Sequence, residues 1–192
     1  MRQVMHPPTN LSKILEMNGD KKKTIYWDAC IFYAFFKGEE HRPGELAEIQ
    51  KQVQLIDADK LILITSAITL TEVLSGKLPA DKKDMFPDLF KRPNILCIET
   101  TLKIAQLAHK IRDYYISHNT DFGGKTVGTP DAIHLASAIT YDVDAFYTFD
   151  EKHKKHELGL LKLPGKLAGE FELNICRPSP PTLITQTNSK LM

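Results

Sequence analysis

Four acidic residues stand where alternating strands and helices would bring their side chains together: Asp28, Glu72, Asp131 and Asp150. Each of them follows a strand-like run or opens a helix-like one. No lysine or arginine lies within four residues of Asp131 on either side. Carboxylates that gather without a cation repel one another, which costs stability unless a partner from outside the chain neutralises them. A hard divalent metal ion is the simplest partner of that kind, and the chemistry this predicts is hydrolysis.

Short apolar runs predict five strands, and helical patterns lie between them. The expected strands are Thr24–Trp27, Leu61–Thr65, Ile95–Ile98, Ala145–Thr148 and Leu173–Cys176. The expected helices are Ala29–Phe36, Glu45–Ile56, Leu70–Leu74, Leu102–Ile116 and Pro130–Tyr141. Strands this short and continuously apolar suit a sheet that is covered on both faces. We therefore predict an α/β fold, a three-layer α/β/α sandwich with a mainly parallel central sheet of four to five short strands.

The helix expected at Pro130–Tyr141 carries the clearest helical pattern. Its apolar stripe consists of Ala132, Leu135, Ala136 and Ile139, at spacings of three and four residues. His134 and Ser137 fall outside this stripe.

The topology of such a sheet explains why the four acids should meet. Asp28 directly follows the first strand, and Asp150 lies just past the fourth. Glu72 lies in the opening turns of the helix after the second strand. Asp131 opens a helix that runs antiparallel to the strands, so it starts where the strands end. Ligands of parallel sheets bind at this carboxyl edge, whereas Asp144, which precedes the fourth strand, belongs to the opposite edge.

Each acid also has an ordinary structural explanation. Asp28 suits the N-cap of the helix that follows it, and Thr69 to Glu72 matches a capping box. Asp131 lies in a first helical turn, where the helix dipole favours an anion and keeps the carboxylate ionised, and Asp150 suits a turn. The convergence of all four on one edge favours a shared site over four separate coincidences.

Composition narrows the class of protein. The 192 residues fit one domain, and 42% hydrophobic with 26% charged residues is typical of a globular chain. The net charge of +1 gathers no nucleic acid from a distance, so any such contact needs a local patch. The cysteines, Cys30, Cys97 and Cys176, are widely spaced, which predicts buried thiols in a reducing compartment. Because signal-peptide and membrane-spanning runs are not seen, we expect a cytoplasmic protein without membrane contact.

Three segments together resemble a PIN domain: TIYWDACIFYAFF, SAITLTEVL and TPDAIHLASAITYDVDAFYTFDEKH. The family comprises metal-dependent nucleases and includes the VapC-like ribonuclease toxins. The resemblance covers residues 23–177, which would form the nuclease domain, with an N-terminal extension at 1–22 and a C-terminal tail at 178–192. One departure is that Ala29 and Cys30 stand where the family often has Thr or Ser and a polar residue. A hydroxyl that orients water is therefore absent from these positions.

The resemblance implies that the four acids hold one or two Mg²⁺ or Mn²⁺ ions. Asp28 and Asp131 would be direct ligands, Asp150 a direct or indirect one, and Glu72 would bind through water or orient the nucleophile. The resemblance also implies that Thr148 assists. Glu99, which follows the third strand, is a further candidate. Carboxylate oxygens match the preference of magnesium better than that of zinc.

The function that follows is a metal-dependent endoribonuclease that hydrolyses RNA phosphodiester bonds, as the toxin of a toxin–antitoxin pair. An antitoxin protein would then cover the acidic edge, and a homodimer is a further expectation. The alternatives are a non-catalytic PIN-like RNA-binding module and a flap-type DNA nuclease. Five cations are expected near the same edge, where they either contact phosphates or simply face solvent: Lys37, Arg42, Lys125, Lys152 and Lys154.

Overall fold

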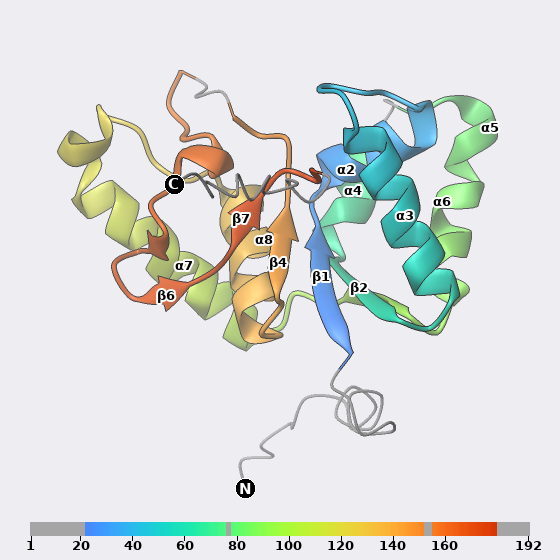
Figure 1. Cartoon of the computed structure of the whole chain (residues 1–192). Helices are drawn as coiled ribbons and strands as arrows, with labels where there is room; N and C mark the ends of the chain where they lie inside the picture. Colours follow the sequence, from blue (N-terminus) through green and yellow to red (C-terminus); the bar gives the residue numbers. More distant parts are fainter. Residues whose placement is uncertain (1–21, 76–77, 152–154, 180–192) are drawn as a thin grey trace, which may run out of the picture.

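The computed structural model describes residues 22–75, 78–151 and 155–179. Its centre is a five-stranded sheet in the order β3-β2-β1-β4-β7, and every neighbouring pair of strands is parallel (Figure 1). The strands are β1 (Lys23–Trp27), β2 (Leu61–Ser66), β3 (Ile95–Ile98), β4 (Ala145–Tyr147) and β7 (Ile175–Cys176). The predicted parallel α/β fold is confirmed, and the strand ends differ from the expected ones by one or two residues.

Five longer helices connect or cover the strands, close to the expected ranges. They are α2 (Ala29–Lys37), α3 (Glu45–Asp57), α4 (Ile68–Leu74), α7 (Leu102–Ser117) and α8 (Thr129–Thr140). Several short elements have no counterpart in the sequence-based prediction: α5 (Ala80–Lys83), α6 (Met85–Asp88) and an antiparallel ribbon of β5 (Lys166–Leu167) and β6 (Phe171–Glu172). Elements of two to four residues are too short for a hydrophobic period to show in the sequence.

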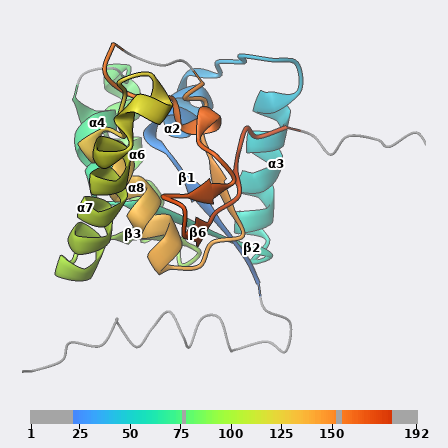
Figure 2. The same cartoon turned by 90° about the vertical axis from the view of Figure 1, so that its left-hand side faces the viewer.

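The sheet separates two apolar cores, because side chains along a strand alternate between its faces. Tyr26 belongs to the core that contains Ile111 of α7 and Leu135 of α8. Its neighbour Trp27 belongs to the core that contains Phe32 of α2. Figure 2 shows α7 and α8 on one side of the sheet and α3 on the other. With both faces of the strands covered, polar side chains reach solvent mainly at the strand ends.

His134 and Ser137, which fall outside the apolar stripe of their helix, nevertheless lie in the interior. Both residues are fully buried. The cause is that α8 packs against α7 and also against β2, so core surrounds more of the helix than one stripe. A buried histidine needs hydrogen-bond partners, and these partners become part of the site described below.

The remaining segments need only brief description. The stretch from Ser117 to Thr129 contains a 3-10 helix at Asn119–Phe122 and a parallel bridge between Thr126 and Glu157. The extension expected at 1–22 and the tail expected at 178–192 lie almost entirely outside the described residues. Among the residues that the structure describes, none of the helices has the length and apolar character needed to cross a membrane.

A buried ion pair joins the last strand to the first third of the chain. The Arg177 guanidinium, just after β7, donates from Nε to Glu45 Oε1 at 2.5 Å and from Nη2 to Glu45 Oε2 at 3.1 Å. The side chains of Arg177 and Glu45 are 13% and 2% exposed. Glu45 also accepts the backbone N–H of Arg42 at 2.9 Å. This carboxylate therefore holds both the end of β7 and the loop before α3.

We expect Arg177→Ala to lower the free energy of unfolding by about 3 kcal/mol, because it leaves the buried carboxylate of Glu45 without its cation. Urea unfolding followed by circular dichroism measures the change. Lys91→Ala is the control, since Lys91 and Asp88 form an ion pair whose side chains are 78% and 64% exposed. Its loss should be below about 1 kcal/mol. Equal losses in the two variants would contradict a stabilising role for the buried pair.

Candidate active site

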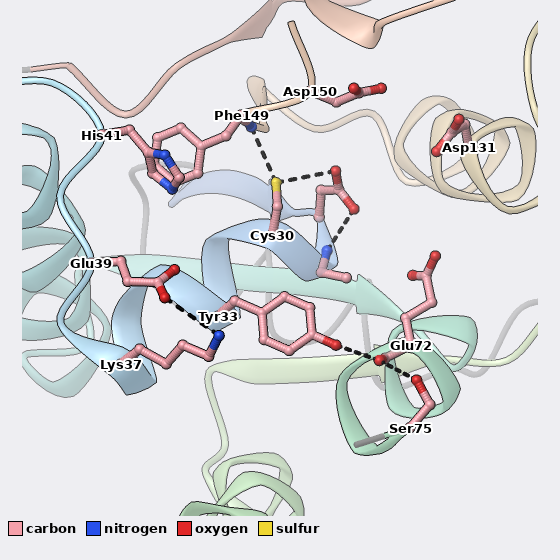
Figure 3. A pocket seen from close by; sticks show the side chains of 12 residues that line it. Cys30, Tyr33, Lys37, Glu39, His41, Glu72, Ser75, Asp131, Phe149 and Asp150 are labelled. Atoms are coloured by element: carbon pink, nitrogen blue, oxygen red, sulfur yellow. Dashed lines mark hydrogen bonds and ion pairs between the residues drawn. The ribbon is translucent and has the colours of Figure 1, made fainter. Parts of the chain in front are cut away.

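The four acids predicted from the sequence line one cleft at the carboxyl edge of the sheet. The cleft has a volume of about 480 Å³, and its lining includes Asp28, Glu72, Asp131 and Asp150. Glu72, Asp131 and Asp150 lie toward one end of it, whereas Lys37, Glu39 and His41 lie toward the other (Figure 3). The topology thus brings together carboxylates from β1, α4, α8 and the segment after β4.

Asp28 is the most buried of the four, at 8% exposed, and directly follows the β1 strand. Its Oδ1 accepts the N–H of Ala29 at 2.5 Å, so Asp28 is also the N-cap of α2. Its Oδ2 accepts the hydroxyl of Thr148 at 2.8 Å. Each carboxylate oxygen has two lone pairs, so neither of these hydrogen bonds exhausts it as an acceptor. The capping role and a metal-binding role are therefore compatible.

Thr148 connects two of the acids. It is fully buried, and its Oγ1 donates to Asp28 while accepting the backbone N–H of Asp150 at 3.0 Å. Asp150 Oδ2 in turn accepts the N–H of Leu160 at 3.2 Å, which fixes the turn after β4. The Thr148 hydroxyl thus links the carboxylate of Asp28 to the backbone of Asp150.

Cys30 is the second residue after Asp28, where PIN domains often have a polar side chain. Its Sγ lies 3.3 Å from Asp28 Oδ2 and accepts the N–H of Phe149 at 3.1 Å. Burial, and next the charge of Asp28, raise the pKa of the Cys30 thiol well above its ordinary value. The group therefore stays a neutral thiol, which can donate weakly to Asp28 and adds no negative charge to the cleft.

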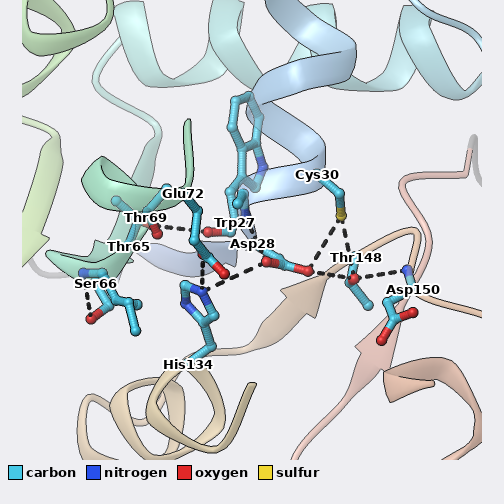
Figure 4. A network of polar contacts seen from close by, with 12 residues as sticks. Trp27, Asp28, Cys30, Thr65, Ser66, Thr69, Glu72, His134, Thr148 and Asp150 are labelled. Atoms are coloured by element: carbon cyan, nitrogen blue, oxygen red, sulfur yellow. Dashed lines mark hydrogen bonds and ion pairs between the residues drawn. The ribbon is translucent and has the colours of Figure 1, made fainter. Parts of the chain in front are cut away.

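Glu72 does not form the capping box that its spacing from Thr69 suggests. The α4 helix begins at Ile68 without a side-chain cap, and the Thr69 hydroxyl shares a 2.7 Å hydrogen bond with the hydroxyl of Thr65. The Glu72 carboxylate instead turns toward His134, whose Nε2 lies 2.8 Å from Glu72 Oε2 (Figure 4). The same Nε2 lies 3.8 Å from Asp28 Oδ1.

The contacts of His134 identify which ring nitrogen carries a hydrogen. An ionised carboxylate only accepts hydrogen bonds, so Nε2 must donate to Glu72. Nδ1 lies 2.7 Å from the hydroxyl of Tyr26. Burial, and next the charge of Asp28, raise the pKa of Tyr26 well above its ordinary value, so this phenol stays protonated. Its O–H group donates a hydrogen bond to Nδ1 when His134 is neutral. Tyr26 and His134 together hold Glu72 in place from beneath the cleft.

The surroundings of His134 also favour its charged form. Burial by itself lowers the pKa of this imidazole, but the hydrogen bond to Glu72 and the charges of Asp28, Glu72 and Asp131 outweigh that effect. The pKa is therefore raised above the ordinary value. When protonated, the ring donates from both nitrogens and places a positive charge among the carboxylates, which limits their repulsion.

His134 is not among the site residues predicted from the sequence, although the sequence contains a signal for it. His134 follows Asp131 by three residues on one helix, and residues at that spacing share a helix face. A residue that lies on the same face as a candidate ligand belongs to the same site, even when it falls outside the apolar stripe.

A further carboxylate, that of Glu157, lies beside the start of α8 and was not predicted from the sequence. A methyl group built on Gly128, just before α8, would lie 2.8 Å from Glu157 Oε1 and 3.0 Å from Asp131 Oδ2. Gly128 thus leaves room for both of these carboxylates beside the start of α8. Its own backbone, with φ −61° and ψ 156°, is open to any residue type. The requirement for glycine at this position is therefore one of space and not of conformation.

The other predicted residues fall in different places. Glu99 is exposed and is not among the residues that line the cleft. Lys37 lines the cleft and pairs with Glu39 at 3.3 Å, and Arg42 donates to Glu151 at 2.8 Å. Lys125 is half-buried outside the cleft lining, while Lys152 and Lys154 lie outside the described residues.

The donor atoms fit a hard divalent cation. Ligand atoms of Asp28, Glu72 and His134 all lie within 4.8 Å of one another, close to the span that one Mg²⁺ ion with ligands about 2.1 Å away can bridge. Since the His134 Nε2 hydrogen points at Glu72, the oxygens of the two carboxylates are the available ligands. Asp131 and Asp150 line the same cleft and add two further carboxylates.

The raised pKa of His134 has a consequence for stability without added metal. A histidine with a raised pKa stabilises the fold fully below its unfolded value of about 6.5, and this contribution is lost as the pH rises through the folded value. We therefore expect His134→Gln to cost more stability near pH 6 than near pH 8.5 in EDTA. Urea unfolding of both proteins at each pH measures this difference, and an equal cost at both pH values would contradict the charge assignment.

Comparisons with known proteins agree with the fold. The family model for the PIN domain matches residues 25–157. A structure titled as a toxin–antitoxin complex from Klebsiella pneumoniae is similar at a TM-score of 0.52 and 19% identity, covering 80% of this chain and 97% of that one. VapBC2 from Rickettsia felis, bound to a DNA fragment from its promoter, is similar at a TM-score of 0.52 and 16% identity, covering 80% and 98%.

A search of the curated proteins finds no match to this chain. At 19% and 16% identity, the similarity to these two structures shows a shared fold only. The assignment to a family rests on the match to the PIN-domain model. That match spans β1 through the segment after β4, and hence every residue that brings a carboxylate to the cleft. This chain belongs to the PIN domain family.

Proposed function

We propose that this chain is a metal-dependent endoribonuclease that hydrolyses RNA phosphodiester bonds. The observation that carries the proposal is the gathering of Asp28, Glu72, Asp131 and Asp150 around one cleft at the carboxyl edge of a PIN fold. Carboxylates of separate segments would repel one another there without a cation. The ion we propose is Mg²⁺ or Mn²⁺, because the donors are oxygens.

Each side chain has a part in holding that ion and the substrate. Asp28 and Asp131 would be direct ligands, the first fixed by Thr148 and Ala29, and the second kept ionised by the start of α8. Glu72 is oriented by His134, and Asp150 is placed by the turn after β4. A divalent ion bound there supplies positive charge and Lewis acidity next to a phosphodiester.

We also propose that a protein partner covers the cleft and keeps the enzyme inactive. Support comes from the two similar structures, whose titles name a toxin–antitoxin complex and VapBC2. A partner that presents a cationic side chain would match the acidic end of the cleft. The homodimer and the cytoplasmic location expected from the sequence remain predictions.

The main test is Asp131→Asn, which keeps the size of the side chain and removes its charge. We expect RNA cleavage to fall by at least about 100-fold, the upper end of what loss of an outer-shell partner costs. Cleavage of labelled single-stranded RNA in Mn²⁺, with and without EDTA, measures the effect. Asp142→Asn is the matched control, because Asp142 is an exposed residue just beyond the other end of α8.

Near-normal, EDTA-sensitive cleavage by Asp131→Asn would contradict the site assignment. RNA binding that is equal with and without Mg²⁺, with no cleavage by the unaltered protein, would favour the non-catalytic binding module. Faster cleavage of branched DNA than of single-stranded RNA would favour the flap-type nuclease. These three outcomes distinguish the proposed function from its alternatives.

A second test uses Gly128→Ala, which changes the site without removing any carboxylate. The added methyl group forces Glu157 and Asp131 to shift, so we expect Mn²⁺ affinity and cleavage to fall by about 10-fold. Stability should not fall, because Gly→Ala at a compatible backbone stabilises by up to about 1 kcal/mol. Calorimetric titration with Mn²⁺ and thermal unfolding measure the two effects. Gly165→Ala is the control, since its methyl group would meet only open space.

A further inference from the structure

The end of the cleft away from Glu72 and Asp131 is built from rings. The His41 imidazole lies 4.4 Å from the Phe149 ring, centroid to centroid, with an angle of 40° between the planes. Both side chains line the cleft, and His41 is exposed (Figure 3). The Arg177 guanidinium lies 5.0 Å from the centroid of Phe149. These contacts form an aromatic wall, the His41–Phe149 wall, that is open to solvent.

The wall is held in place from two directions. Phe149 is fixed by its N–H, which donates to Cys30 Sγ at 3.1 Å, and by the guanidinium of Arg177. The backbone next to His41 is also held in place, because the N–H of Arg42 donates to the buried carboxylate of Glu45. A wall that keeps its shape without a ligand loses little conformational entropy when one binds.

Charge does not explain what this end of the cleft would bind. Lys37 pairs with Glu39, and Arg42 pairs with Glu151. Arg177 pairs with both Glu45 and Glu151. Because these cations are matched by carboxylates, attraction for phosphate is weak here, and the flat surface of the rings is the feature left to recognise a ligand.

The position of the wall identifies the kind of ligand. Phe149 stands in the chain between Thr148, which donates to Asp28, and Asp150, which lines the acidic end. With a divalent ion bound at the acidic end, as proposed above, a ligand that reaches both ends needs a planar group close to an anionic group. A nucleotide has this form, since its base and its phosphate are joined through one sugar, and bases stack on aromatic side chains regardless of sequence.

We infer that the His41–Phe149 wall is a stacking subsite for a nucleobase next to the phosphodiester at the acidic end of the cleft. This inference rests on the proposed function, for which it names the element that positions the substrate. Binding there comes from stacking on His41, while the acids act on the neighbouring phosphodiester. The subsite should accept single-stranded nucleic acid only, because a base in a duplex has its faces covered.

The test compares His41→Ala with His41→Phe, which keeps an aromatic face. We expect His41→Ala to raise KM for single-stranded RNA by about 10-fold while kcat stays nearly constant, and His41→Phe to stay close to the unaltered protein. His118→Ala is the matched control, because the exposed His118 stacks on Tyr114 with centroids 4.3 Å apart, outside the cleft lining. Thermal unfolding of each variant checks that the fold is unchanged.

A binding measurement keeps this inference separate from the proposed function. Short single-stranded oligonucleotides that contain 2-aminopurine are titrated into the Asp131→Asn protein, with and without His41→Ala. Quenching of the 2-aminopurine fluorescence that depends on His41 supports the subsite even if the unaltered protein cleaves no RNA. Cleavage with unchanged KM in His41→Ala, together with unchanged quenching, would overturn the subsite and leave the nuclease intact. An effect of His41→Ala on a protein partner alone would also overturn it.

Discussion

Repulsion between carboxylates at the carboxyl edge of the sheet is the constraint around which this molecule is arranged. Asp28 is nearly buried, and Glu72, Asp131 and Asp150 line the same cleft. Groups of like charge hold such positions only if donors face them and if their segments cannot move apart. The hydroxyl of Thr148, the thiol of Cys30 and the Nε2 hydrogen of His134 meet the first condition. The parallel sheet, with a core on either face, meets the second.

The hydrogen bonds beneath the cleft extend well into the core. Tyr26 is part of the apolar core between the sheet and α8, yet its hydroxyl reaches His134, and His134 reaches Glu72. A central strand therefore contributes to the site through a side chain that points into the core as well as through the acid at its end. A buried chain of hydrogen bonds stabilises the fold only when every polar group in it has a partner, because an unpaired polar group in this core would be strongly destabilising.

Much of this arrangement follows from the sequence, and the exceptions have physical causes. The longer elements are visible in the sequence, since Leu102–Ser117 shows a helical period and Leu61–Ser66 begins with an apolar run. The topology of a parallel sheet then brings Asp28, Asp131 and Asp150 to one edge. His134 escaped prediction because hydropathy scores a histidine as polar, whereas its burial depends on Tyr26, far away in the sequence. Glu157 escaped because its position beside Gly128 depends on the fold of the chain after β4. Pairings between distant side chains leave no periodic trace in a sequence.

The link between Glu45 and Arg177 has a consequence for biosynthesis. A ribosome releases the segments of this protein in order, and Asp131, Asp150 and finally the last strand emerge late. Until Arg177 reaches Glu45, the loop before α3 has only part of its anchor, and the sheet lacks its outer strand. In the order of synthesis, Asp131 and Asp150 follow Asp28 and Glu72 by more than fifty residues, so the acidic cleft can close only after the segment beyond β4 has been made.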